Sequence, residues 1–186
     1  MSSHQGRDQV FISYSREDVK WLNRLSVFLK PYVRQGLSIW SDRHVRVGDE
    51  WRREIDAALD RAAVGVLLVS PEFLASDFIM DVELPALTEA AENGLLTLVC
   101  VPVSESPYRA TRLTEYQWAR SPDDPLDRLR GPERNTALVE IVSRVVEVAA
   151  GRVETPAPAT AFVERRLGGP VVVETEARPG QLHGVP

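Results

Sequence analysis

The sequence contains one cysteine and three histidines among its 186 residues, and this scarcity excludes several classes of protein. Cys100 has no second cysteine to pair with, so an internal disulfide and a zinc site of four cysteines are both excluded. His4, His44 and His183 stand far apart and lack the His-x-x-x-His spacing of a helical zinc site. We therefore expect no metal centre, and we expect Cys100, which lies inside an apolar run, to be a small core residue.

Several motifs of nucleotide and hydrolase chemistry are also missing. The sequence has neither the GxGxxG pattern of dinucleotide-binding folds nor the GxxxxGK[ST] pattern of P-loops. It also has no GxSxG elbow, which would mark a Ser–His–Asp hydrolase. A ligand phosphate would therefore have to be bound by arginines such as Arg16 and Arg43, or by the N-terminus of a helix.

Long apolar runs and an excess of positive charge are absent as well. No run approaches the length of about 18 apolar residues that spans a membrane, and residues 1–8 lack the apolar core of a signal peptide. The formal net charge is −5, from 27 acidic and 22 basic residues, whereas modules that bind nucleic acid usually present a basic face. We expect a cytoplasmic protein that binds neither nucleic acid nor a membrane.

Short apolar runs alternate with segments of helical periodicity over most of the chain. Strands are expected at residues 9–14, 37–40, 64–69 and 95–103, with a short edge strand around 116–118. The central runs are apolar throughout, as in strands that are covered on both faces. The pattern predicts an α/β fold with a parallel sheet and helices on both faces. A phosphoacceptor receiver domain shares this class but is excluded, because Ser70 stands where its acceptor aspartate should be and no lysine follows Lys30.

The composition changes near residue 151. Residues 9–151 carry the pattern of strands and helices and are assigned to one domain, whereas residues 1–8 are assigned to a disordered N-terminus. Residues 152–186 contain a linker-type sequence, Thr155–Thr160, and a Gly-Gly-Pro step, with no pattern of burial beyond Val171–Val173. We interpret 152–186 as a linker or tail.

Two local patterns refine the expected helices. Ser15 and Asp18 have the spacing of a capping box, with Ser15 as the N-cap of the first helix. The helical region that opens at Ser70 and Pro71 should break before Pro85, because proline cannot donate to the helical ladder.

Glu83 is the carboxylate in the most unusual position. Helical spacing places it on an apolar stripe with Ile79, Val82, Ala86 and Ala90, on the side of the sheet where ligands bind in parallel α/β folds. A carboxylate in apolar surroundings has a raised pKa unless a cation or hydrogen-bond donors stabilise its charged form, and such groups occur at functional sites. The alternative is that Glu83 turns outward where Pro85 distorts the helix and forms a surface ion pair.

Several segments, in order along the chain, resemble the TIR (Toll/interleukin-1 receptor) domain in its bacterial form. They are Val10–Tyr14, Ser38–Asp42 with Val47–Asp49, Ser70–Ile79 leading into Glu83-Leu84-Pro85, Leu113–Gln117 and Pro125-Leu126. The resemblance covers residues of about 9–150 and implies a flavodoxin-like open parallel sheet of four or five strands in the order 2-1-3-4-5.

The resemblance implies an enzyme of the NAD-cleaving type, with Glu83 as the catalytic residue. NAD would be the substrate, so no cofactor is expected, and the products would be nicotinamide and either ADP-ribose or a cyclic ADP-ribose. The nicotinamide leaves as a neutral group, so the second, acidic carboxyl group of glycosidases is not needed. The carboxylate would stabilise the ribosyl cation of the transition state.

The residues expected to bind NAD follow the ends of the first three strands. Arg16 or Arg43 would contact the diphosphate, and Phe78 or Ile79 would face the nicotinamide. TIR glutamates commonly follow a tryptophan by four residues, and Ile79 occupies that position here. The full expected set is Tyr14, Ser15, Arg16, Asp42, Arg43, Ser70, Phe78 and Ile79.

The resemblance also implies that the domain acts by self-association. In TIR enzymes the loop that corresponds to 42–48 contacts a neighbouring protomer and helps to close the NAD site, so we expect a homo-oligomer or filament on activation. Residues 180–186 resemble a linker that precedes a signal-transduction ATPase module, which would make this chain the N-terminal effector of a larger protein. A role in bacterial immune, anti-phage signalling is expected on this basis.

Two other functions remain open. The first is a non-catalytic TIR adaptor that acts only by homotypic association, which the absence of the usual tryptophan favours. The second is an enzyme similar to nucleoside deoxyribosyltransferases, which use a glutamate on a related fold.

Overall fold

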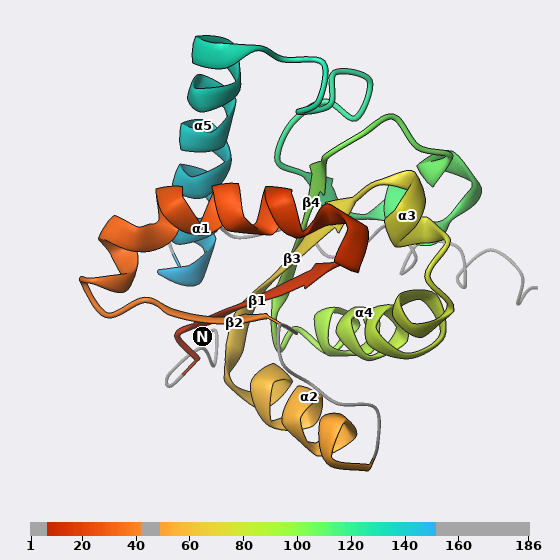
Figure 1. The fold of residues 1–186 in the computed structure, drawn as a ribbon. Coiled ribbons are helices and arrows are strands. Elements are labelled where there is room, and N and C mark those ends of the chain that lie inside the picture. The colour runs from red at the N-terminus through yellow and green to blue at the C-terminus, as the bar shows by residue number, and fades with distance from the viewer. Residues whose placement is uncertain (1–6, 42–48, 152–186) are drawn as a thin grey trace, which may run out of the picture.

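A five-stranded parallel sheet with the strand order β2-β1-β3-β4-β5 forms the centre of the molecule (Figure 1). The computed structural model describes residues 7–41 and 49–151. The strands are β1 (Gln9–Tyr14), β2 (Ser38–Ser41), β3 (Ala62–Val69), β4 (Thr97–Pro102) and β5 (Gln117–Trp118). The fold class, the strand order and the edge strand around residue 117 are confirmed.

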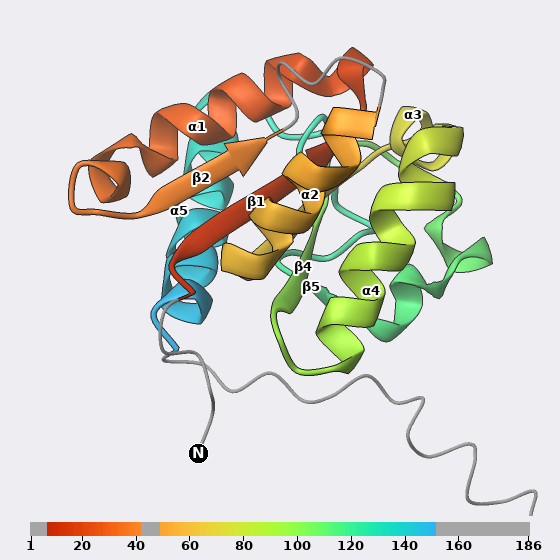
Figure 2. The ribbon, with the colours of Figure 1, turned by 90° about the horizontal axis from the view of Figure 1, so that it is seen from below.

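Helices connect the strands and cover both faces of the sheet. Figure 2 shows α2 and α4 on the near face, with α1 and α5 behind the sheet. The α-helices are α1 (Val19–Val33), α2 (Asp49–Arg61), α3 (Pro71–Leu74), α4 (Leu84–Glu92) and α5 (Gly131–Ala149). Short turns are η1 (Arg16–Asp18), η2 (Ile79–Glu83), η3 (Tyr108–Ala110) and η4 (Arg112–Glu115).

Strand β3 separates two apolar cores, and all eight of its residues are buried. Side chains alternate between the faces of a strand, so Val64 and Val66 pack with α1 and α5, whereas Leu67 and Val69 pack with α2 and α4. Cys100 lies fully buried in β4, as expected, and burial raises the pKa of its thiol to about 12.

Gly65 allows the close approach of α4 and β4 to this central strand. A Cβ atom at residue 65 would lie 2.7 Å from Leu98 Cδ2 and 3.1 Å from Leu87 Cδ2. The absence of a side chain is therefore a packing requirement at this position.

The predicted capping box is wrong. Ser15 makes no side-chain bond to the following turn, and α1 begins only after the 3₁₀ turn η1. The carboxylate of Asp18 instead accepts a hydrogen bond from Ser70, a residue on another strand end. A tertiary contact has replaced the local bond that the spacing suggested.

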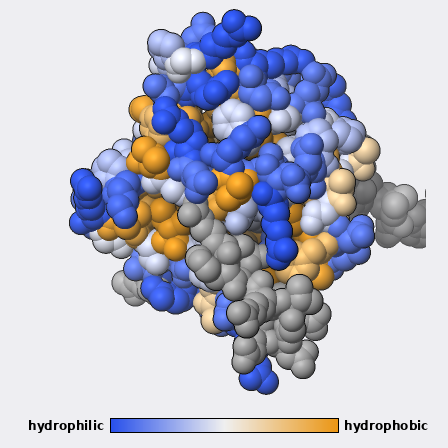
Figure 3. All heavy atoms as spheres, viewed as in Figure 1, coloured by the Kyte–Doolittle hydropathy of each residue, from blue (hydrophilic) through white to orange (hydrophobic). Residues whose placement is uncertain are grey.

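Among the described residues that are visible in Figure 3, separate apolar groups lie among hydrophilic side chains. Of the helices in the described part of the chain, none has the length and apolar character to cross a membrane. Arg7 lies in the segment 1–8 that the sequence predicts to be disordered, and its side chain donates to the carbonyl oxygens of Leu59 and Ala62 at 2.9 and 3.1 Å.

Candidate functional site

Several polar side chains are buried where β1 and β3 end. Ser13, Asp18, Ser70 and Glu83 have exposed fractions of 2%, 5%, 0% and 3%. Ser13 belongs to β1, Asp18 to the turn after it, and Ser70 directly follows β3. Burial of polar groups is costly unless they are hydrogen-bonded, so such a cluster needs internal partners.

Glu83 is hydrogen-bonded to the sheet. The hydroxyl of Ser13 donates to Oε2 of Glu83 at 2.6 Å, a length typical of a hydroxyl that donates to a carboxylate. The burial of Glu83 excludes the outward orientation that the sequence left open. Asp81, two residues earlier, is exposed, so the two carboxyl groups lie on different sides of the turn.

A π-helical turn, η2, orients Glu83. The N–H of Leu84 donates to the carbonyl of Ile79, five residues earlier, instead of four. Pro85 has no N–H, and in a regular α-helix its ring would clash with the carbonyl four residues earlier. The break expected before Pro85 therefore takes the form of a widened turn, and π-turns are frequent at functional sites.

Asp18 and Ser70 form a second buried link between the two strand ends. The hydroxyl of Ser70 donates to Oδ2 of Asp18 and accepts from the backbone N–H of Phe73 at 2.9 Å. Burial raises the pKa of the Asp18 carboxyl, against the opposing effect of the hydrogen bond from Ser70. The hydrogen bond from the Phe73 N–H to the Ser70 hydroxyl also caps the first turn of α3, since Ser70 is the N-cap of that helix.

The two links fix both ends of the segment 70–83. Ser70 is held by Asp18 and Glu83 by Ser13, and between them Phe78 is 37% exposed while Ile79 is 3% exposed. Ile79 packs into the core below α2 and α4. Of the two residues expected beside a nicotinamide, Phe78 is the one that reaches the surface.

The remaining expected site residues lie at the first strand end or outside the described residues. Tyr14 is half-buried, Ser15 is 8% exposed and Arg16 is exposed on η1. Asp42 and Arg43 lie outside the described residues. The structure thus places Tyr14, Ser15 and Ser70 on the same edge of the sheet as Glu83.

Sequence reasoning missed Ser13 and Asp18. Ser13 lies inside a strand and its spacing carries no signal, whereas Asp18 was assigned to a local cap. The sequence held only an indirect signal for Ser13. A buried carboxylate such as Glu83 requires a hydrogen-bond donor, and the neighbouring strand β1 contains few side chains that can donate.

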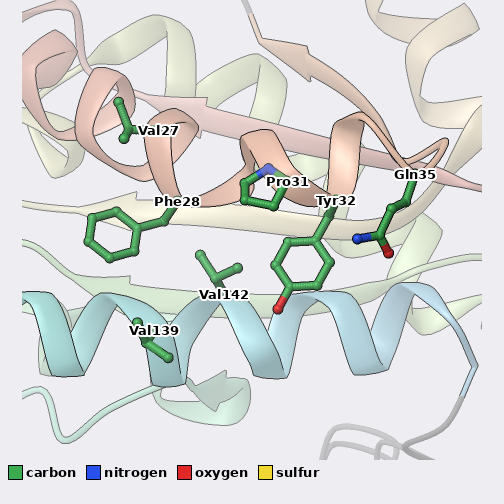
Figure 4. Close-up of a pocket in the computed structure, with 7 residues that line it drawn as sticks. All are labelled: Val27, Phe28, Pro31, Tyr32, Gln35, Val139 and Val142. Atoms are coloured by element: carbon green, nitrogen blue, oxygen red, sulfur yellow. The ribbon is translucent and has the colours of Figure 1, made fainter.

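An apolar pocket lies away from these residues, between α1 and α5. It has a volume of about 440 Å³, and Figure 4 shows Phe28, Pro31 and Tyr32 of α1 opposite Val139 and Val142 of α5. It offers no titratable carboxylate, so it is not a second candidate for the chemistry of Glu83. Among residues 7–41 and 49–151, no group of three or more acidic, histidine or cysteine side chains could hold a metal ion.

A family profile described as the TIR domain matches residues 10–130. The chain belongs to the TIR domain family. The match runs from the second residue of β1 through β5 and includes the buried cluster around Glu83.

Two curated proteins are similar to this chain. An uncharacterized protein, y4lF, from Sinorhizobium fredii (strain NBRC 101917 / NGR234) is 29% identical over 159 residues, which cover 81% of this chain and 46% of the relative. The putative disease resistance protein At4g11170 from Arabidopsis thaliana is 30% identical over 94 residues, 50% of this chain and 8% of the relative. The chain spans less than half the length of either relative.

Among solved structures, the TIR domains of the activated Roq1 resistosome, which directly recognizes the pathogen effector XopQ, are similar to this chain. The sequence identity is 17% and the TM-score is 0.43, with 76% of this chain and 83% of that chain covered.

Proposed function

We propose that this TIR domain is an NAD glycohydrolase that cleaves the bond between nicotinamide and ribose, with Glu83 as the catalytic residue. The observation that carries the proposal is the buried Glu83 carboxylate at the carboxyl ends of the strands, hydrogen-bonded to Ser13 at 2.6 Å. Open parallel sheets bind ligands at that edge. A buried, oriented carboxylate at a ligand-binding edge is suited to stabilise a developing positive charge.

The reaction needs one carboxylate and no general acid. The bond between ribose C1′ and the pyridinium nitrogen breaks, its electron pair goes to nicotinamide, and the ribose becomes a cation-like species that Glu83 stabilises. Water then attacks C1′ and loses a proton, which gives ADP-ribose. Attack by the adenine ring of the same molecule would give a cyclic ADP-ribose instead.

The surrounding residues would bind and orient NAD. Phe78 would face the nicotinamide, with Ile79 supporting it from the core, and Arg16 or Arg43 would contact the diphosphate. Ser13 would keep the carboxylate of Glu83 in one orientation. Tyr14, Ser15 and Asp42 would line the pocket, and Ser70 would support its floor through Asp18. No cofactor is needed, because NAD is the substrate.

The test is nicotinamide release from NAD by the purified chain, followed by chromatography. Glu83→Gln keeps the size of the side chain but removes its charge, so cleavage should fall by about 10²-fold or more. Glu89→Gln, on the exposed face of α4, is the matched control and should retain activity. Full activity of Glu83→Gln would overturn the mechanism, and cleavage of plain nucleosides in place of NAD would favour the transferase-like alternative.

A non-catalytic adaptor is the second candidate, and the low exposure of Glu83 favours it. At 3% exposure the carboxylate has almost no direct access to a ligand in this conformation. An adaptor needs only a stable surface, so absence of NAD cleavage at every protein concentration would decide for it.

The wider setting belongs to the same proposal. The enzyme would act in the cytoplasm in bacterial anti-phage signalling, as a homo-oligomer of TIR domains joined through residues 152–186 to a sensor or ATPase module. Two curated relatives longer than this chain agree with a domain that works within a larger protein. Neither nucleic acid nor a membrane is proposed as a partner.

A further inference from the structure

A pocket with three cationic side chains lies where α1 begins and where the chain enters α5. It has a volume of about 410 Å³ and is lined by Lys20, Trp21, Arg24, Asp127 and Arg134. We call it the basic pocket. Its volume falls within the range of small-molecule sites, about 300–1,000 Å³.

The basic pocket is separate from the site around Glu83. Trp21 belongs to the core between the sheet and α1 and α5, whereas Ile79 and Leu84, which flank the turn of Glu83, pack in the core on the opposite face. The residues that line the basic pocket are therefore different from those around Glu83, although Lys20 stands two residues after Asp18 in the chain.

The cations of the basic pocket are held in place by the protein. Arg134 donates from Nε to the carbonyl of Leu126 at 3.2 Å and from Nη2 to the carbonyl of Leu129, and its guanidinium lies 5.2 Å from the centre of the Trp21 ring. Lys20 Nζ lies 5.9 Å from the same ring. Cations above an indole are attracted by its π-system, which orients them.

Arg24 is oriented in a similar way. Its Nη2 donates to Oδ1 of Asn135 at 2.6 Å, and its guanidinium lies 5.1 Å from the centre of the Phe28 ring. Carbonyl, amide and aromatic groups therefore fix two guanidiniums without neutralising them. Each arginine has five N–H donors, and the contacts described use only some of them.

Within the part of the chain that the structure describes, none of the three cations forms an ion pair with a carboxylate, although the charge of Lys20 also acts on the Asp18 carboxyl group. The ion pairs found there involve other arginines, and Asp127, although it lines the basic pocket, pairs with none of the three cations. The whole chain carries a net charge of −5, so this local excess of positive charge runs against its surroundings. Like charges held close together repel, and a multivalent anion would relieve that repulsion.

We propose that the basic pocket binds a small phosphorylated molecule with at least two negative charges. Guanidinium groups match phosphate oxygens in geometry, and their fixed orientation lowers the entropy lost on binding. The carboxylate of Asp127 disfavours a ligand that is anionic over its whole surface. The same carboxylate could accept a hydrogen bond from a hydroxyl group of the ligand. The inference goes beyond the proposed NAD cleavage and does not depend on it.

The test uses inorganic pyrophosphate as the probe in titration calorimetry with the purified chain. At about 0.15 M salt, where exposed charges are screened beyond roughly 8 Å, we expect saturable binding with a Kd below about 1 mM. Lys20→Gln combined with Arg24→Gln should weaken binding at least about tenfold, because two charge-assisted contacts are lost. Both residues are exposed, so the variant should fold, and its melting temperature without probe checks this.

The matched control is Lys30→Gln combined with Arg34→Gln, at the C-terminal end of the same helix, where both residues are also exposed. This control removes the same charge and should retain the affinity for pyrophosphate. Equal weakening in both variants, or binding that disappears at about 0.15 M salt, would reduce the effect to net charge and overturn the proposal. An acidic peptide that binds more tightly than pyrophosphate and loses its affinity in the Lys20/Arg24 variant would also overturn it, in favour of a protein partner. Glu83→Gln should leave pyrophosphate binding unchanged, which separates this pocket from the NAD site.

Discussion

The hydroxyl of Ser13 donates to the carboxylate of Glu83 at 2.6 Å, joining residues that stand 70 positions apart in the chain. The adjacent link runs in the opposite sense, since there Asp18, in the turn that follows β1, supplies the carboxylate and Ser70 supplies the hydroxyl. Both hydrogen bonds are buried, so water does not compete for them. Together they fix the strand-end segment 70–83 against β1.

Ser13→Ala should lower the activity of Glu83 without removing it. The carboxylate would lose the hydrogen bond from Ser13, so kcat for NAD should fall about tenfold or more while KM changes little, because the contact orients a group that acts in the transition state. Steady-state kinetics of nicotinamide release measure both. Ser26→Ala is the control, since the Ser26 hydroxyl bonds only to its own helix, at the carbonyl of Leu22. An unchanged kcat in Ser13→Ala would show that the orientation of Glu83 does not depend on this bond.

Asp18→Asn should make stability less dependent on pH. Burial raises the pKa of Asp18 above its ordinary value of 3.8, so the folded state binds the proton more tightly than the unfolded state does. The wild type should therefore lose stability as pH rises from about 4 through the folded-state pKa, and the asparagine variant should lack this loss. The amide oxygen can still accept from Ser70.

Urea unfolding of the wild type and Asp18→Asn over a pH series measures this difference. The variant should gain relative to the wild type as pH rises, with a plateau once Asp18 is fully ionised in the folded state. The opposite trend would mean that the hydrogen bond from Ser70 stabilises the charged carboxylate by more than burial destabilises it.

The central strands could be predicted from the sequence because their signal is local. The run around Val64 to Val69 is apolar on both faces, and the observed strand starts two residues earlier and ends at the same residue. The position of Glu83 on an apolar stripe was also a local signal, and its burial follows from it.

The contacts of the site could not be predicted, because they join distant segments. Ser70 lies 52 residues from Asp18, and no spacing rule connects them. Ser15 and Asp18 have the spacing of a capping box, but Ser15 makes no capping bond and Asp18 accepts a hydrogen bond from Ser70 instead. A tertiary contact therefore takes the place of the local one. The π-turn before Pro85 has a local cause, yet proline alone does not distinguish a break from a widened turn.

Gly65→Ala should destabilise the fold through the contact with β4 and α4. The added methyl group would lie 2.7 Å from Leu98 Cδ2, so neighbouring side chains must shift, at a cost of about 1–3 kcal/mol. Urea unfolding measures the loss. The double variant Gly65→Ala with Leu98→Ala should be more stable than the sum of the two single effects predicts, because the smaller side chain makes room. Strict additivity would show that the two positions do not compete for space.

Assembly should raise the activity of the isolated chain. Glu83 is 3% exposed, so the proposed cleavage of NAD requires a conformation in which this carboxylate is more open to a ligand. A neighbouring protomer that binds this open conformation would increase its population, and the increase follows mass action. Specific activity at saturating NAD should therefore rise with protein concentration over about a hundredfold range, and fusion to an oligomerising module after residue 151 should raise it at low concentration. Glu83→Gln in the same fusion is the control and should stay inactive. A constant specific activity over the whole range would show that one chain completes the site by itself.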